Sequence, residues 1–104
     1  MDIKLYRKND NILNKFKSFS VKEFKFYPNY IYLSAYNSIH IWHKLSAYTI
    51  KELYYVKNII FIYLESNHSF KNNSKKFYLK LVFSDKKILD KTIRLLNRLL
   101  NRQV

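Results

Sequence analysis

The sequence KFYLKLVF at residues 76–83 decides the fold, because its large apolar side chains fall on every second position. A period of two is that of a β-strand with one buried face, so this stretch predicts a strand whose register is nearly forced. The residues predicted to face the core are Phe77, Leu79, Leu81 and Phe83.

The period changes directly after this strand. Ser84 is a suitable N-cap and Asp85 places an acid in the first turn, so a helix is predicted from residue 84 to residue 104. Its apolar face is broad and predicts docking on a sheet. That face comprises Ile88, Leu89, Leu96, Leu99 and Leu100, flanked by Ile93 and Leu95.

Upstream, alternating segments separated by turn residues predict three hairpins. The first joins Val21–Tyr27 to Tyr30–Ala35 through Pro28 and Asn29. The second turns near Tyr36 and Asn37, with Ile39 and Ile41 facing inward and His40 and Trp42 facing the other way. The third joins Leu53–Val56 to Ile59–Leu64 through Lys57 and Asn58.

The N-terminal residues allow two interpretations. Ile12, Leu13, Phe16 and Phe19 have helical spacing and favour a short helix over Asp10–Phe19, whereas Ile3–Arg7 fits a strand equally well. The chain is thus expected to be a single α+β domain, an antiparallel barrel or sandwich of about six to seven strands closed by a C-terminal amphipathic helix. Residues 1–20 form an N-terminal extension in this scheme, residues 21–83 the strands and residues 84–104 the helix.

Charge is the strongest functional signal. Lysine and arginine number 20 against 7 acidic residues, which gives a net charge of +13 and predicts an anionic partner. Part of this excess is also explained by the compositional bias of an A/T-rich genome. The absence of cysteine, of a secretory signal and of a long apolar run favours a cytoplasmic protein that, if it meets a membrane, lies on its surface.

No enzymatic chemistry is predicted. The chain has no glycine for a phosphate-cradling loop, and its carboxylates are scattered outside any motif, so no catalytic residue and no cofactor is expected. His40 and His43 have a spacing that suits a metal on a helix. On the predicted strand they face opposite sides, so no metal site is expected.

Three groups of residues are candidates for contact with an anionic surface. The last helix carries a basic stripe of Lys87, Lys91, Arg94, Arg98 and Arg102. A solvated helix face explains that stripe equally well. Residues 67–76 form a basic loop with Lys71, Lys75 and Lys76, although a flexible strand connection is the more common function of such loops. Trp42 beside His43 and Lys44 suits an interfacial aromatic contact, while a partly packed core position is the alternative.

The order of hairpins followed by one capped helix, from Val21 to Leu100, resembles a pleckstrin-homology-like domain. The segments 39–45 and 48–53, the hairpin 56–64 and the helix start at Phe83-Ser84-Asp85 are similar to the YcxB-like bacterial version. Small basic proteins of this kind resemble immunity proteins of leaderless bacteriocins. The resemblance implies a cytoplasmic protein, peripheral at the inner face of the cell membrane, that protects the producer cell from a pore-forming peptide.

The expected partner is therefore an anionic membrane surface, with direct capture of the bacteriocin peptide as a further option and a monomeric state assumed. The rival function is nucleic-acid binding, since lysines and 18 tyrosine and phenylalanine side chains offer phosphate contacts and stacking surfaces. Against it, most aromatic side chains are expected to fill the core, and no known nucleic-acid-binding signature is present. A module that blocks a nucleic-acid surface is a third, less favoured class.

Overall fold

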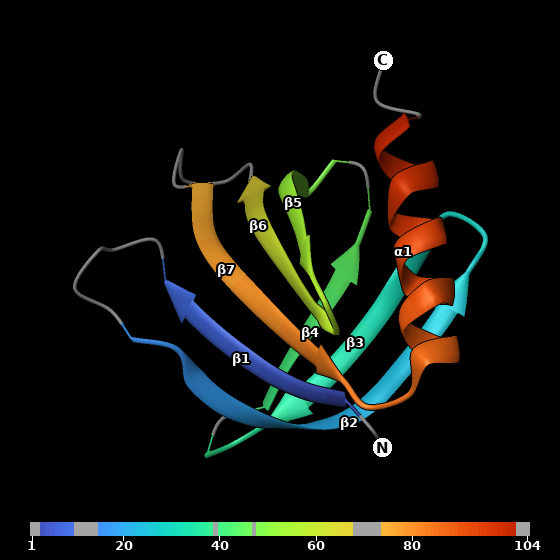
Figure 1. Ribbon diagram of the computed structural model, residues 1–104. Coiled ribbons are helices and arrows are strands. Elements are labelled where there is room, and N and C mark those ends of the chain that lie inside the picture. Colours follow the sequence, from blue (N-terminus) through green and yellow to red (C-terminus); the bar gives the residue numbers. More distant parts are fainter. Residues whose placement is uncertain (1–2, 10–14, 39, 47, 68–73, 102–104) are drawn as a thin grey trace.

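The protein is an α+β fold in which one curled antiparallel sheet packs against a C-terminal helix (Figure 1). The computed structural model describes residues 3–9, 15–38, 40–46, 48–67 and 74–101. The elements are β1 (Ile3–Asn9), β2 (Lys17–Tyr27), β3 (Tyr30–Tyr36), β4 (His40–Leu45), β5 (Ile50–Val56), β6 (Ile59–Asn67), β7 (Ser74–Phe83) and α1 (Lys86–Asn101).

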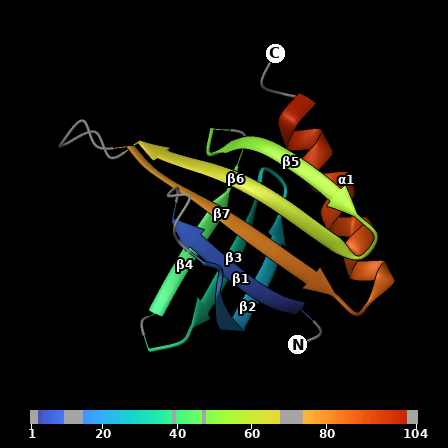
Figure 2. The same cartoon turned by 60° about the vertical axis from the view of Figure 1, so that its left-hand side comes forward.

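The seven strands form a single sheet in the order β4-β3-β2-β1-β7-β6-β5. The sheet curls into a half-barrel, and α1 lies along one side of it (Figures 1 and 2). The strand register shifts between Val21 and Glu23 in β2 and between Ile50 and Glu52 in β5. Such irregularities bend a strand and increase its twist, which helps the sheet to curl.

The predicted register of β7 is confirmed. Phe77, Leu79, Leu81 and Phe83 are all buried on the inner face of the sheet, where they join a core that is largely aliphatic. The three predicted hairpins are confirmed as β2–β3, β3–β4 and β5–β6. Ile39, predicted to face inward, lies outside the described residues.

The predicted helix is confirmed over Lys86–Asn101, but its N-cap is Asp85 and not Ser84. The Asp85 carboxylate accepts a hydrogen bond of 2.8 Å from the backbone N–H of Lys87, and the Leu89 N–H donates to the Asp85 carbonyl at 3.1 Å. Asp85 therefore caps the helix and is not a member of its first turn. Residues 102–104 of the predicted helix lie outside the described residues.

The predicted N-terminal helix is wrong for residues 17–19, which belong to β2. Leu5 pairs with Phe19 and Arg7 with Lys17, so the start of β2 is held by β1. β1 itself lies between β2 and β7, which confirms the strand alternative for residues 3–7 and makes them part of the sheet. The hydrogen bonds and packing with β1 therefore decide the structure of residues 17–19, although their apolar spacing suits a helix. Residues 10–14 of the predicted helix lie outside the described residues.

The expectation that aromatic side chains fill the core is wrong for tyrosine. All ten tyrosines are described, and none of them is buried. Phe77 and Phe83 are the aromatic members of the core of the described residues. Leucine and isoleucine fill most of the interior, so the tyrosines are left on or near the surface of the domain.

Candidate anion-binding site

A cavity of about 440 Å³ opens where β1 ends, β2 begins and β3 turns into β4. This end of β1 lies on the side of the sheet away from α1 (Figures 1 and 2). The lining residues are Arg7, Lys8, Asn9, Lys15, Lys17, Phe19, Asn37, Ser38 and Ile41. They come from the three segments 7–9, 15–19 and 37–41, which the β1–β2 and β2–β3 pairings bring together.

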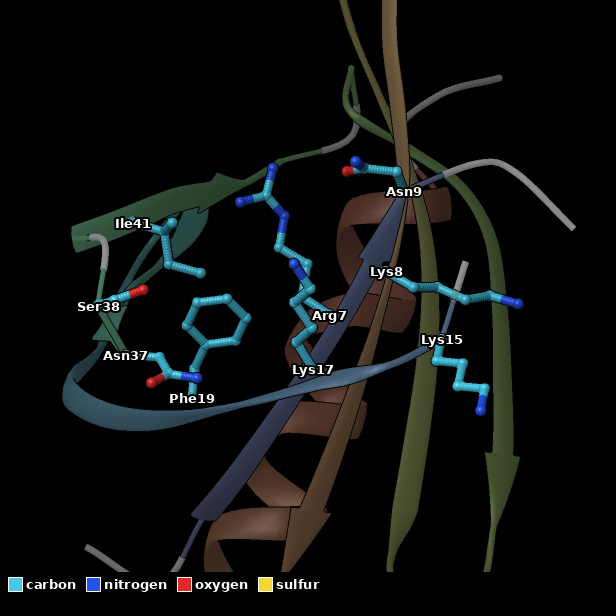
Figure 3. Close-up of a pocket in the computed structure, with 9 residues that line it drawn as sticks. All are labelled: Arg7, Lys8, Asn9, Lys15, Lys17, Phe19, Asn37, Ser38 and Ile41. Carbon is cyan, nitrogen blue, oxygen red and sulfur yellow. The ribbon is translucent and has the colours of Figure 1, made fainter. Parts of the chain in front are cut away.

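The lining is cationic, since four of its members carry a positive charge and none of these nine residues is a carboxylate. Figure 3 shows Arg7 and Lys17 on the side of β1 that also holds Phe19 and Ile41, whereas Lys8 and Lys15 extend to the other side. Asn37 is fixed by a hydrogen bond of 2.9 Å from its side-chain amide to the Ser18 carbonyl. An anion entering beside Arg7 and Lys17 would therefore meet two cations and an apolar wall.

Arg7 and Lys17 occupy directly opposed positions on β1 and β2. Opposed residues of antiparallel strands point to the same face with close Cβ atoms, and like charges at such positions destabilise a sheet. Because no carboxylate lies in the lining to offset this repulsion, a bound anion would relieve it. The pair therefore has the arrangement of an anion site.

Arg7 also packs on Phe77, a core residue outside the cavity lining. The Arg7 guanidinium lies over the Phe77 ring at 4.6 Å, and the His43 ring lies 4.8 Å from the same ring. Arg7 Nε and His43 Nε2 are buried without a hydrogen-bond partner among the described residues. Burial lowers the pKa of Arg7 from its ordinary value, and an arginine nevertheless stays charged in proteins.

His43 is neutral at physiological pH. Burial of its ring, and secondarily the positive charge of Arg7, lower its pKa to about 3. His43 therefore adds no charge to the site and instead supports the Arg7–Phe77 contact from within the core. His43 follows His40 at an odd offset on β4, and within the described residues no group of three or more potential ligands could hold a metal ion.

The predicted basic stripe lies elsewhere. Lys87, Lys91, Arg94 and Arg98 are exposed on α1, which lies away from the end of β1 that forms the cavity (Figure 1). The Lys91 ammonium lies 4.5 Å from the centre of the Phe26 ring, so this member also packs on β2. Arg102 and Lys71 lie outside the described residues, as does the side chain of Lys75, and Lys76 is exposed on β7.

Trp42 is exposed, with 62% of its surface accessible, and so is not a core residue. It lies on the outer face of the β3–β4 hairpin, next in sequence to the cavity residue Ile41. Tyr36, next in sequence to the cavity residue Asn37, is 51% exposed on the same face. Tyr36 and Trp42 are diagonal neighbours across the two strands, so an exposed aromatic pair lies on the face of this hairpin opposite to the cavity residue Ile41.

Sequence reasoning missed the cavity, although one signal for it was present. Arg7 follows Ile3 and Leu5 at the same strand phase, which places a cation on the core-facing side of β1. A charge at a core-facing position requires a partner or a function. Lys17, Asn37 and Ile41 join it only through strand register, which the sequence alone did not give.

These features define a small domain made of a cationic half-barrel and one helix, with a cavity suited to anions. Searches of family models, curated proteins and solved structures found no match to this chain. Among the described residues, the only helix is too short and too polar to cross a membrane.

Proposed function

We propose that this protein is a non-enzymatic, pleckstrin-homology-like module that binds the phosphate-bearing surface of the cell membrane through the cavity between β1, β2 and the β3–β4 turn. The observation that carries this proposal is the opposed Arg7–Lys17 pair in a lining without a carboxylate. A lipid phosphate at this position would be contacted by both cations. Asn37 and Ser38 add polar groups at the rim.

The exposed aromatic pair supports a membrane as the source of the phosphate. Tryptophan and tyrosine favour the interface between head groups and acyl chains, because each has an apolar ring and a polar edge. Trp42 and Tyr36 project from the hairpin that forms one wall of the cavity. Both rings lie on the outer face of that hairpin, so they would contact the membrane interface beside a headgroup held in the cavity.

The two basic regions do not contribute equally in this orientation. The domain measures 39 × 36 × 23 Å, and electrostatic attraction falls off over about 8 Å at physiological salt. When the cavity faces the membrane, α1 lies away from it, because the helix is far from the end of β1 that forms the cavity (Figure 2). The helical stripe then adds to the overall attraction during approach and makes little contact.

The double substitution Arg7→Gln and Lys17→Gln is expected to weaken binding to vesicles of phosphatidylglycerol and phosphatidylcholine about tenfold or more, because each cation near such a surface contributes roughly 1 kcal/mol. The matched control, Lys87→Gln with Arg94→Gln, removes the same two residue types from α1 and is expected to have less than a threefold effect. Trp42 is the only tryptophan, so a blue shift of its fluorescence reports binding directly. Equal weakening by both variants would contradict the proposed orientation.

The cellular function that we propose for this membrane binding is self-immunity against a leaderless pore-forming bacteriocin. It rests on the resemblance of the hairpin-and-helix order to such immunity proteins and on the cationic surface, which would concentrate the protein on the anionic inner leaflet. There the protein would mask the lipid sites that the peptide uses. Direct capture of the peptide is less favourable, because such peptides are themselves cationic.

Expression in a sensitive strain is expected to raise resistance to the cognate peptide, and the Arg7→Gln, Lys17→Gln variant is expected to lose most of that protection at equal protein levels. Growth inhibition by a panel of leaderless peptides measures both. A wild-type protein that binds anionic vesicles and protects against no peptide would refute the immunity function while leaving membrane binding intact.

A further inference from the structure

A second surface, distinct from the cavity, lies on the outer face of β1, β7, β6 and β5, which lie side by side (Figure 2). Alternate residues of these strands, such as Leu5, Ile60 and Leu79, are buried, so the residues between them face outward. We call this surface the aromatic–lysine face. It comprises Lys4, Tyr6, Lys8, Tyr54, Phe61, Tyr63, Lys76, Tyr78 and Lys80.

Rings and lysines are arranged in rows across the strands. In one row Tyr6 lies opposite Lys80, which lies opposite Phe61, and Phe61 lies opposite Tyr54. In the next row Lys8 lies opposite Tyr78, which lies opposite Tyr63. The face therefore places positive charges beside pairs of aromatic rings at the spacing of neighbouring strands, about 4.8 Å.

The lysines lie over the rings. The Lys80 ammonium is 5.2 Å from the centre of the Tyr6 ring and 5.9 Å from that of Phe61. The Lys8 ammonium is 5.1 Å from the centres of both the Phe16 and Tyr78 rings. These are weak cation–π contacts between mostly half-buried side chains at the surface, and a stronger anionic ligand can replace them.

The face has an excess of positive charge. Its four lysines share it with two carboxylates, because Glu52 lies opposite Tyr63 and Glu65 lies opposite Lys76. Glu65 forms an ion pair with Lys51 at 3.9 Å, and Glu52 accepts a hydrogen bond of 3.0 Å from the Tyr54 hydroxyl. That hydrogen bond and the negative charge of Glu52 raise the pKa of Tyr54, so its hydroxyl remains a neutral donor.

We infer that the aromatic–lysine face binds single-stranded nucleic acid. Phosphates would draw the ammonium groups of Lys8 and Lys80 away from the rings, and bases would stack on the ring surfaces that are then uncovered. Base–aromatic stacking is stronger than an exposed cation–π contact, so the exchange favours the complex. The shape of the face favours a single strand over a membrane. Its central rings lie half-buried among lysine side chains, whereas Trp42 projects from its hairpin as a membrane-contacting side chain would.

The core does not use up the aromatic side chains that nucleic-acid binding would need. Leucine and isoleucine fill most of the interior and no tyrosine is buried, so these rings remain on or near the surface. The inference is independent of the proposed membrane function, because the cavity and the aromatic–lysine face have different lysines at their centres. Lys8 is the residue that contributes to both surfaces.

The test is fluorescence anisotropy with a labelled oligothymidylate of about 15 nucleotides, at about 0.1 M salt. The unmodified protein is expected to bind it, and Tyr6→Leu with Lys80→Gln is expected to weaken binding about tenfold. The matched control is Tyr32→Leu with Lys44→Gln. It removes an opposed tyrosine–lysine pair from the outer face of β3 and β4 and is expected to change binding less than threefold.

Circular dichroism and thermal melting verify that both variants fold. If the first does not, a titration of the unmodified, isotope-labelled protein with the same oligonucleotide replaces it, and amide shifts confined to β1, β5, β6 and β7 are then expected. Equal weakening by both variants, equal affinity for a duplex, or shifts confined to α1 or the cavity would overturn the inference. So would a protein that ignores the oligonucleotide and binds anionic vesicles through Tyr6 and Lys80.

Discussion

Replacing Leu96 by alanine is expected to lower the free energy of unfolding by about 2–5 kcal/mol, the usual cost of truncating a buried leucine. Leu96 has no accessible surface and belongs to the buried face of α1 with Leu89, Leu95 and Leu99. A domain of this size is stable by about 5–15 kcal/mol, so the loss is a large part of the total. Urea denaturation followed by circular dichroism measures it.

The control for Leu96 is Arg94→Ala, two positions away on the exposed side of the same helix. It keeps a good helix former and removes no core contact, so a change within about 0.5 kcal/mol is expected. A loss below about 1 kcal/mol for Leu96→Ala would show that α1 contributes little to the stability of the half-barrel, contrary to its packing.

Replacing His43 by leucine is expected to make the protein resistant to acid. The unfolded chain takes up a proton on His43 below about pH 6.5, whereas the folded protein, in which this pKa is lowered to about 3, does not. The contribution of neutral His43 to the free energy of unfolding is therefore fully present at neutral pH and is lost as the pH falls from about 6.5 towards 3. The loss amounts to about 4 kcal/mol at pH 3.

Urea unfolding at several pH values between 7 and 3 measures this effect. Every other group is common to both proteins, so the difference between the profiles of wild type and His43→Leu isolates the histidine. At pH 7 the variant is expected to be at least as stable as wild type, because leucine leaves no buried Nε2 without a partner. Parallel pH profiles would mean that His43 is protonated or solvated in the folded protein.

Sequence periodicity was sufficient to predict a strand or helix wherever one face of that element is buried. The alternation in β7 and the apolar face of α1 located the last strand, its register and the docked helix. Thr92 escaped this reasoning, because it is fully buried while its hydroxyl donates a hydrogen bond of 2.7 Å to the Ile88 carbonyl. A polar residue satisfied within its own helix can occupy the core without a sequence signal.

The functional surfaces were harder to predict, because they depend on which strands pair. Arg7 and Lys17 become neighbours only through the β1–β2 register, and Tyr6, Lys80 and Phe61 only through the order β1-β7-β6. The helical spacing of residues 12–19 also concealed the start of β2. The basic stripe on α1 was easier to see, because it depends only on local helical spacing.

The two strands that end the sheet have a consequence for solubility at high concentration. Within the described residues, β4 and β5 each leave one row of backbone groups without a neighbouring strand, which is a template for aggregation through the addition of further strands. β4 is the shortest strand of the sheet, with six residues, and β5 contains a register shift beside Lys51. Lys44 places positive charge along β4, and a second copy would bring its own net charge of +13. The cationic character that suits anionic ligands therefore also protects a tyrosine-rich β-sheet from growing into fibrils.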